Sequence, residues 1–186
     1  MKTSHLLNVA LVLGITVFVS CSENKTDSGE KSKVKLTAQD SITKVINELE
    51  GKVNMLDESF DRTSAKQLLS AYQNYYNQNY KDSIAGIYLY KAARLAQGLK
   101  NFKQAISLFT NYHDGFPNHP NRPQAALIVG VIYEQDLHDK ANAKSAYQRV
   151  IEIHPESQEA KDASSLISYL DMSDEDLIKM LKEKNK

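Results

Sequence analysis

The chain has 186 residues, which is the length of one domain of ordinary size. Its 23 Lys and Arg balance 23 Asp and Glu, so the formal net charge is zero and binding to nucleic acid through overall positive charge is disfavoured. Apolar residues make up 41% of the chain, enough for a core, and the few breakers, 4 Pro and 7 Gly, favour long helices over many short strands.

Residues 1–20 are predicted to be a secretory signal peptide. Lys2 is followed by an almost entirely apolar run of 14 residues, 6–19, which is too short to span a bilayer as a helix and is typical of the hydrophobic part of a signal peptide. Ser20 then precedes Cys21, the only cysteine, so an intramolecular disulfide is excluded.

Residues 18–21, Phe-Val-Ser-Cys, resemble a bacterial lipobox, in which a small residue precedes the cleavage site and the cysteine thiol carries the lipid. The resemblance implies that Cys21 becomes a lipidated N-terminus that anchors the chain in a membrane. The alternative is an ordinary signal peptide with a chance cysteine. Residues 21–37 are predicted to be a flexible linker, because Val34 is the one apolar residue between 22 and 35.

Residues 38–61 are predicted to form a short heptad helix. The apolar residues with the 4-3-4-3-4 spacing of a coiled-coil seam are Ile42, Ile46, Leu49, Val53, Leu56 and Phe60. The seam is short and contains Gly51, so two alternatives stay open. It either forms a coiled coil between copies of the chain or packs on the chain's own domain.

Two later segments have identical internal spacing: a small residue, an aromatic residue four positions on, an apolar residue after three more, and a proline after five more. They are Ala105, Phe109, Tyr112 and Pro117, and Ala143, Tyr147, Val150 and Pro155. The two prolines are 38 residues apart, a period in the range of helical repeats. Each proline is expected to end a helix, because it lacks the backbone N–H that a helix interior needs.

This spacing resembles the tetratricopeptide repeat (TPR). The resemblance implies an all-α fold of antiparallel helix pairs, an α–α superhelix, over residues 62–171, with the small residues where two helices pack closely. The segment from Tyr133 to Ala143 is one residue longer than in the family, so a bulge is expected between those two helices.

Two further features flank the repeats. A degenerate earlier repeat contains four tyrosines whose rings are expected to pack in the core with the hydroxyls reaching the surface. They are Tyr72, Tyr75, Tyr76 and Tyr80. Residues 172–186 are predicted to form a C-terminal capping helix, which begins with a capping box made by Ser173 and Asp176.

The predicted lipid anchor, linker, heptad helix and TPR body together resemble small TPR lipoproteins of the Gram-negative envelope, both BamD-like outer-membrane assembly lipoproteins and the coiled-coil/TPR periplasmic protein of the Tol–Pal system. The resemblance implies an outer-membrane lipoprotein whose domain faces the periplasm and serves as a scaffold or adaptor for envelope proteins or peptide segments. The alternative is a structural or oligomerising envelope protein that acts through the heptad helix.

A partner-binding groove is predicted on the first helix of each repeat, the helix that lines the peptide-binding face in TPR arrays. Tyr90 and Arg94 are one helical turn apart and share a face, and Leu127 and Val131 have the same spacing in the next repeat. These four residues would give an apolar floor with one cation, which suits a partner segment. The alternative is that the C-terminal helices cover them.

No motif for catalysis is found. The nucleophile elbow, the nucleotide-binding glycine motifs and the zinc-protease motif are all missing from the sequence. His113 and His119 flank one loop, whereas His138 and His154 lie in other turns. We therefore expect a protein that is not an enzyme and that binds no metal and no cofactor.

Overall fold

The structure, a computed structural model, describes residues 37–53 and 61–184. The predicted signal peptide, Cys21 and nearly all of the predicted linker lie outside the described residues, as do Leu56 and Phe60 of the heptad seam.

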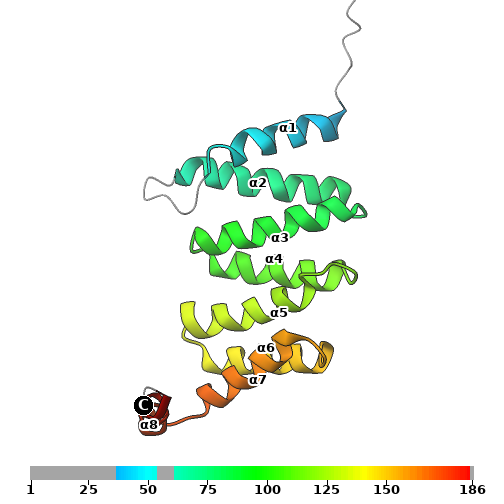
Figure 1. The fold of residues 1–186 in the computed structure, drawn as a ribbon. Coiled ribbons are helices and arrows are strands. Elements are labelled where there is room, and N and C mark those ends of the chain that lie inside the picture. The colour runs from blue at the N-terminus through cyan, green and yellow to red at the C-terminus, as the bar shows by residue number, and fades with distance from the viewer. Residues whose placement is uncertain (1–36, 54–60, 185–186) are drawn as a thin grey trace, which may run out of the picture. The chain divides into compact units, whose positions relative to one another are not determined.

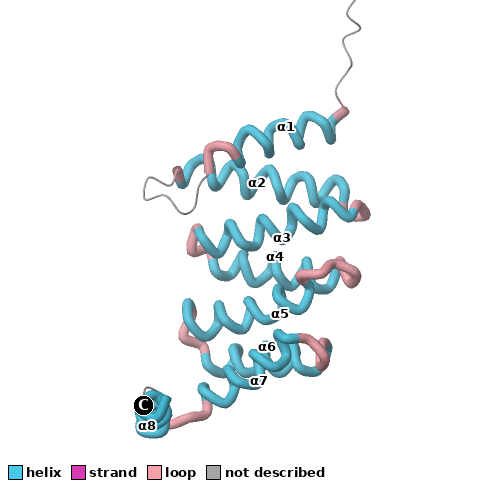
Figure 2. The backbone as a smooth tube through the Cα atoms, viewed as in Figure 1, coloured by secondary structure: helices cyan, strands magenta, loops and turns pink. Residues whose placement is uncertain are grey.

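Within the described ranges all regular structure is helical, and short loops join the helices (Figures 1 and 2). In chain order the helices are α1 (Ala38–Glu50), α2 (Arg62–Asn79), α3 (Ser83–Gly98), α4 (Phe102–Gly115), α5 (Arg122–Val131), the π-helical turn η1 (Ile132–Asp136), α6 (Lys140–Ile153), α7 (Gln158–Leu170) and α8 (Asp174–Lys184). The predicted all-α fold of TPR-type helix pairs is confirmed.

Local sequence signals set the ends of these helices. The side chains of Asp61, Asp82 and Ser157 each accept a hydrogen bond from a backbone N–H in the first turn of α2, α3 and α7. The helices α4 and α6 end at Gly115 and Ile153, two residues before Pro117 and Pro155, as the spacing predicted.

The helices lie in two rows. α1, α3 and α5 belong to the first row, because Glu50 of α1 contacts Lys91 of α3 and Tyr90 of α3 contacts Gln124 of α5. α2, α4 and α6 form the second row, because side-chain hydrogen bonds join α4 to α2 and α6 to α4. α7 continues the first row by packing on α5 and α6. Each helix therefore packs mainly on its neighbours in the chain, which is the arrangement of a repeat protein.

Close helix packing at the two small repeat positions is confirmed, because Ala105 and Ala143 have no exposed surface. Over the described residues the hydrophobic core forms two clusters. The first joins α1 through η1, and the second joins α5, η1, α6 and α7 around Ala143, Tyr147 and Val150.

Ala105→Leu is expected to lower the free energy of unfolding by about 1–3 kcal/mol, because three extra carbon atoms must enter a filled space between helices. Ser107→Leu is the matched control, since Ser107 is exposed on the same helix. Chemical denaturation of both variants measures the difference. Equal stability of Ala105→Leu and the wild type would contradict the repeat register.

The extra residue of the second repeat lies in η1. There the backbone N–H of Leu137 donates to the carbonyl of Ile132 at 3.0 Å, five residues back, which is the hydrogen bond of a π-helix. The prediction placed the bulge in the turn between the two helices, and the structure places it in the last turn of the first helix. The turn itself keeps its conformation, because Lys100 and His138, at the same position of each repeat, have φ angles of 62° and 54°.

The predicted heptad helix over 38–61 is shorter in the structure, since α1 ends at Glu50 and Gly51 is its C-cap. Ile46 and Leu49 are buried and Ile42 and Val53 are half-buried against the first cluster, to which α2 contributes. These seam residues therefore pack on the chain's own domain, the second of the two alternatives.

The C-terminal helix α8 begins at Asp174, directly after Ser173 of the predicted capping box. The backbone N–H of Asp176 donates to Ser173 Oγ at 3.2 Å, and this hydroxyl donates to the Asp176 carboxylate at 2.7 Å. The role of α8 as a cap on the repeats stays a prediction. Over the described residues, none of the helices combines the length and the apolar character that crossing a membrane requires.

Candidate functional site

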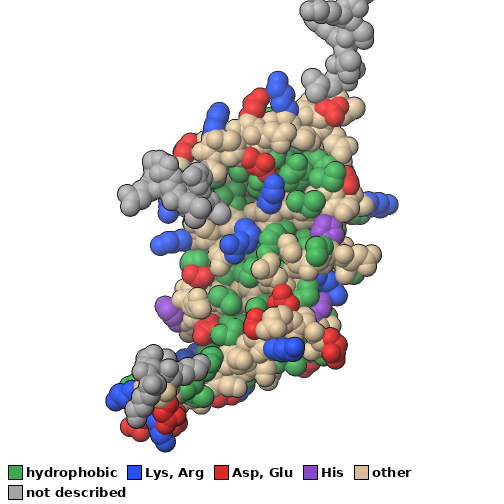
Figure 3. Space-filling model, viewed as in Figure 1, with side chains coloured by type: hydrophobic (Ala, Val, Ile, Leu, Met, Phe, Trp, Pro, Cys, Tyr) green, Lys and Arg blue, Asp and Glu red, His purple; other side chains and the backbone are tan. Residues whose placement is uncertain are grey.

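A pocket of about 260 Å³ lies where α1, α2 and α3 meet. We call it the α1–α3 pocket, and its lining residues are Glu50, Val53, Leu68, Tyr72, Tyr90, Lys91, Arg94 and Leu95. Its surface is mostly apolar, and charged side chains contribute from α1 and α3. Figure 3 shows hydrophobic side chains over these helices with basic and acidic side chains among them.

The acidic residue of the pocket is already paired. Glu50 Oε1 accepts hydrogen bonds from Lys91 Nζ at 2.8 Å and from the Tyr72 hydroxyl at 2.6 Å. Burial would raise the pKa of Glu50, but these bonds outweigh it and hold the pKa below its usual value. The Lys91 ammonium is thus largely neutralised by Glu50, and it also lies 5.7 Å from the ring centre of Tyr88.

Arg94 is the cation of the pocket that has no acidic partner among the described side chains. Its side chain is exposed, and its recorded hydrogen bond runs from Nη1 to Gln97 Oε1 at 3.3 Å. The ion pairs of residues 37–53 and 61–184 do not include it. An exposed guanidinium is a suitable partner for a carboxylate, which it can bind through two N–H groups at once.

Tyr90 lines the same pocket but also holds the two repeats together. Its hydroxyl donates to Gln124 Oε1 at 2.7 Å, and its ring lies against the rings of Phe109 and Tyr112, with centroids 5.7 and 5.1 Å away. Burial raises the pKa of the Tyr90 hydroxyl. A change at Tyr90 would alter both the pocket and the core, so Arg94 is the cleaner test of binding.

Leu127 and Val131 lie elsewhere. Both are half-buried and pack against the second core cluster, as do Leu166, Ile167 and Leu170 of α7. The structure therefore brings Tyr90 and Arg94 together in the α1–α3 pocket and does not bring Leu127 and Val131 to it. Whether any of the four binds a partner stays a prediction.

The tyrosine run packs largely as predicted. Tyr72 and Tyr75 are buried, yet their hydroxyls make polar contacts, Tyr72 with Glu50 and Tyr75 with the amide of Gln39 at 2.8 Å. Burial and the hydrogen bond to Glu50 raise the pKa of Tyr72 far above its ordinary value. Tyr80 differs, because 60% of its surface is exposed.

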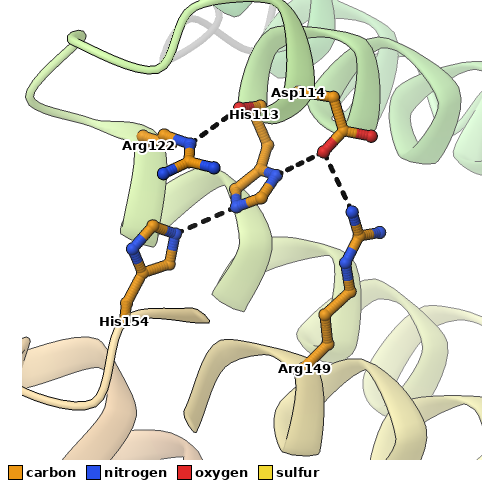
Figure 4. A network of polar contacts seen from close by, with 5 residues as sticks. All are labelled: His113, Asp114, Arg122, Arg149 and His154. Atoms are coloured by element: carbon orange, nitrogen blue, oxygen red, sulfur yellow. Dashed lines mark hydrogen bonds and ion pairs between the residues drawn. The ribbon is translucent and has the colours of Figure 1, made fainter. Parts of the chain in front are cut away.

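A second polar arrangement, which the sequence analysis missed, joins the ends of α4 and α6 (Figure 4). His113 Nε2 lies 2.9 Å from His154 Nε2, and His113 Nδ1 lies 2.6 Å from the Asp114 carboxylate. Arg149 donates to the same carboxylate at 2.9 Å, and Arg122 Nε donates to the backbone carbonyl of His113 at 2.8 Å. We call these five residues the histidine network.

Sequence spacing gives little sign of this network. His113 lies four residues before Pro117, whereas His154 lies directly before Pro155, so the two histidines occupy different positions of the repeat. They meet because the ends of successive second-row helices are side by side. Among the described residues, no group of three or more His, Cys, Asp or Glu side chains is arranged to hold a metal ion.

Comparison with known proteins identifies the repeat. A tetratricopeptide-repeat family model matches residues 124–157, which span α5 from Gln124 through η1 and α6. No curated protein matches the chain. The chain is thus a TPR-containing protein, and TPR repeats generally mediate protein–protein interactions.

Proposed function

We propose that the chain is a membrane-tethered TPR scaffold that binds a segment of a cell-envelope protein in the α1–α3 pocket. The observation that supports this most is the pocket itself, an apolar hollow whose rim carries Arg94, which has no acidic partner within residues 37–53 and 61–184. The apolar floor suits one aliphatic or aromatic anchor side chain, and Arg94 suits a carboxylate next to it.

The composition of the pocket sets the chemistry of the segment. Val53, Leu68 and Leu95 offer apolar contact, while Glu50 and Lys91 neutralise each other. Among the described side chains that line the pocket, the charge left over is the positive charge of Arg94. An extended or helical segment with a hydrophobic residue and an acidic residue close by would therefore match both features.

Binding of such segments is tested with a random peptide display library and the full chain as bait. Peptides that pair an aliphatic or aromatic residue with Asp or Glu are expected to be enriched. Arg94→Glu is expected to lose these peptides, with roughly tenfold weaker binding or more, because a charge-assisted hydrogen bond becomes a repulsion. Titration of one enriched peptide measures the change.

The control for this experiment is Lys103→Glu, which makes the same charge change at an exposed residue of α4. It is expected to keep the wild-type peptides and their affinity. If Arg94→Glu selected the same peptides as the wild type, the pocket would not be the binding site.

The membrane tether, the outer-membrane location, and a role in outer-membrane protein assembly rest on the residues around Cys21 and on the resemblance to envelope lipoproteins. Lipidation at Cys21 would hold the repeats near the membrane by the linker of residues 21–37. The alternative function, oligomerisation through the heptad helix, has less support, since Ile46 and Leu49 are already buried in the first core cluster.

A further inference from the structure

The histidine network closes one end of a cleft between α4 and α6. This cleft has a volume of about 270 Å³, and residues of α5 such as Ala126 and Val129 form part of its lining. Ile106 and Thr110 lie on the α4 side, and His113 and Arg149 also line it. The contacts His113–His154 and Asp114–Arg149 therefore bridge two second-row helices across the cleft.

The protonation of the histidine pair follows from its partners. A carboxylate only accepts hydrogen bonds, so His113 Nδ1 carries a proton and donates to Asp114. In neutral His113 the Nε2 atom then has a lone pair, and it accepts the Nε2–H of His154. A single proton, the one bonded to His154 Nε2, therefore lies between the two Nε2 atoms, which are 2.9 Å apart.

The hydrogen bond between the two rings survives the addition of one proton but not of two. One added proton binds His154 Nδ1, and the N–H···N bond between the rings remains. With two, both Nε2 atoms carry hydrogens that face each other at 2.9 Å, and two positive rings repel. We propose that the His113–His154 pair is a pH-sensitive latch, which joins the ends of α4 and α6 near neutral pH and releases them on acidification, so that the α4–α6 cleft opens.

The charges around the latch set the direction of its response. Asp114 from α4 and Glu159 from α7 are negative, whereas Arg122 from α5 and Arg149 from α6 are positive, and Arg149 is paired with Asp114. The guanidinium of Arg122 lies beside the two rings (Figure 4), where its charge disfavours both a divalent metal ion and added protons. Burial, Arg122 and His113 together lower the pKa of His154.

The effect of pH on folding has a definite sign. In the unfolded chain His154 binds a proton near its ordinary pKa, about 6.5, whereas in the folded chain it binds one only at lower pH. The unfolded state therefore holds more protons between these values. The contribution of His154 to stability is therefore complete above about pH 7 and declines as the pH falls below about 6.5, before a second proton parts the two rings.

His154 also holds the start of the next helix. It is the C-cap of α6, and its carbonyl accepts hydrogen bonds from the backbone N–H of Ser157 at 2.9 Å and from the Ser157 hydroxyl at 2.8 Å. Ser157 in turn caps α7. Release of His154 is therefore expected to move the whole α6–α7 turn away from α4, and not only the His154 side chain.

The latch is tested by the distance between two spin labels, one at Asn111 on α4 and one at Gln148 on α6, both exposed positions. The labels are attached to cysteines introduced in the full chain, in which Cys21 is replaced by serine, and the distance is measured in mild detergent at pH 7.5 and pH 5.0. We expect the label distance to lengthen by several ångströms at pH 5.0. An unchanged distance would overturn the proposal.

His154→Gln is the decisive variant. The glutamine amide can donate to His113 or, after a flip, accept from it, and it does not titrate in this range. We expect its label distance to be the same at both pH values. If His154→Gln does not fold, His113→Gln takes its place, because it also replaces one titrating ring of the pair by an amide that does not titrate.

The matched control removes a histidine outside the latch. His138 is exposed and has a φ of 54°, a conformation that asparagine tolerates. In His138→Asn the label distance is therefore expected to lengthen on acidification as it does in the wild type. If the label distance lengthened as much in His154→Gln as in His138→Asn, the response would come from other groups and the latch would be rejected.

Discussion

Replacing Tyr147 with alanine is expected to lower the free energy of unfolding by about 3–5 kcal/mol. The Tyr147 ring has no exposed surface and lies at the centre of the second core cluster, between α5, α6 and α7. Its hydroxyl donates to Glu134 at 2.6 Å, so the change also removes this hydrogen bond. Chemical denaturation measures the loss. Tyr147→Phe, which keeps the ring, is expected to lose about 1 kcal/mol.

The cause of this effect is checked at Gly130, which lies against the same ring. A Cβ atom at Gly130 would overlap the Tyr147 ring, whereas one at Gly115 would meet nothing. Gly130→Ala is therefore expected to destabilise the wild type, although glycine to alanine in a helix ordinarily stabilises by about 1 kcal/mol. Gly115→Ala is the control without a clash.

The two changes are expected to be strongly coupled. In the Tyr147→Ala background the ring is gone, so Gly130→Ala should become neutral or stabilising, which a double-mutant cycle measures directly. Additive losses in the double mutant would show that the glycine is not required by the ring. The close approach of α5 and α6 would then need another explanation.

Cys21→Ala is expected to remove the chain from the membrane fraction or leave it with an uncleaved N-terminus. Each CH₂ of an acyl chain buried in a bilayer contributes about 0.8 kcal/mol to membrane binding, so two or more chains give a stable anchor. Without the Cys21 thiol these chains cannot be attached. Membrane fractionation of cells that produce the wild type and the variant measures the change.

Mass spectrometry supplies the direct check on lipidation. The native protein is expected to begin at Cys21 and to carry acyl chains. Ser22→Ala is a suitable control, because it changes the next residue without removing the thiol. A mature protein that begins at another residue, or one without added lipid, would contradict the prediction.

The spacing of residues in the sequence was sufficient to predict the repeats, because it depends on which positions are buried. Ala105 and Ala143 had to be small, and Pro117 and Pro155 had to follow a helix, wherever the rest of the fold lay. The extra residue near Tyr133 was also visible in the sequence. Its place inside η1 was not, because a π-turn and a longer loop have the same residue count.

The candidate site was predictable only in part. The spacing of Tyr90 and Arg94 places both on one helical face, and both line the α1–α3 pocket. The same spacing at Leu127 and Val131 could not reveal that α7 packs over that part of α5. The contact of His113 with His154 depends on how successive helix pairs stack, which no local pattern records.

The packing of each helix mainly on its sequence neighbours has a consequence for how the chain folds. Contacts between residues close in sequence cost little loop-closure entropy, so such chains fold fast and can begin at any helix pair. The second core cluster, around Tyr147, shares only α5 and η1 with the first. Cooperativity between the two halves therefore passes through α5 and η1, and we expect the part around α6 and α7 to open locally at a lower free energy than the whole chain.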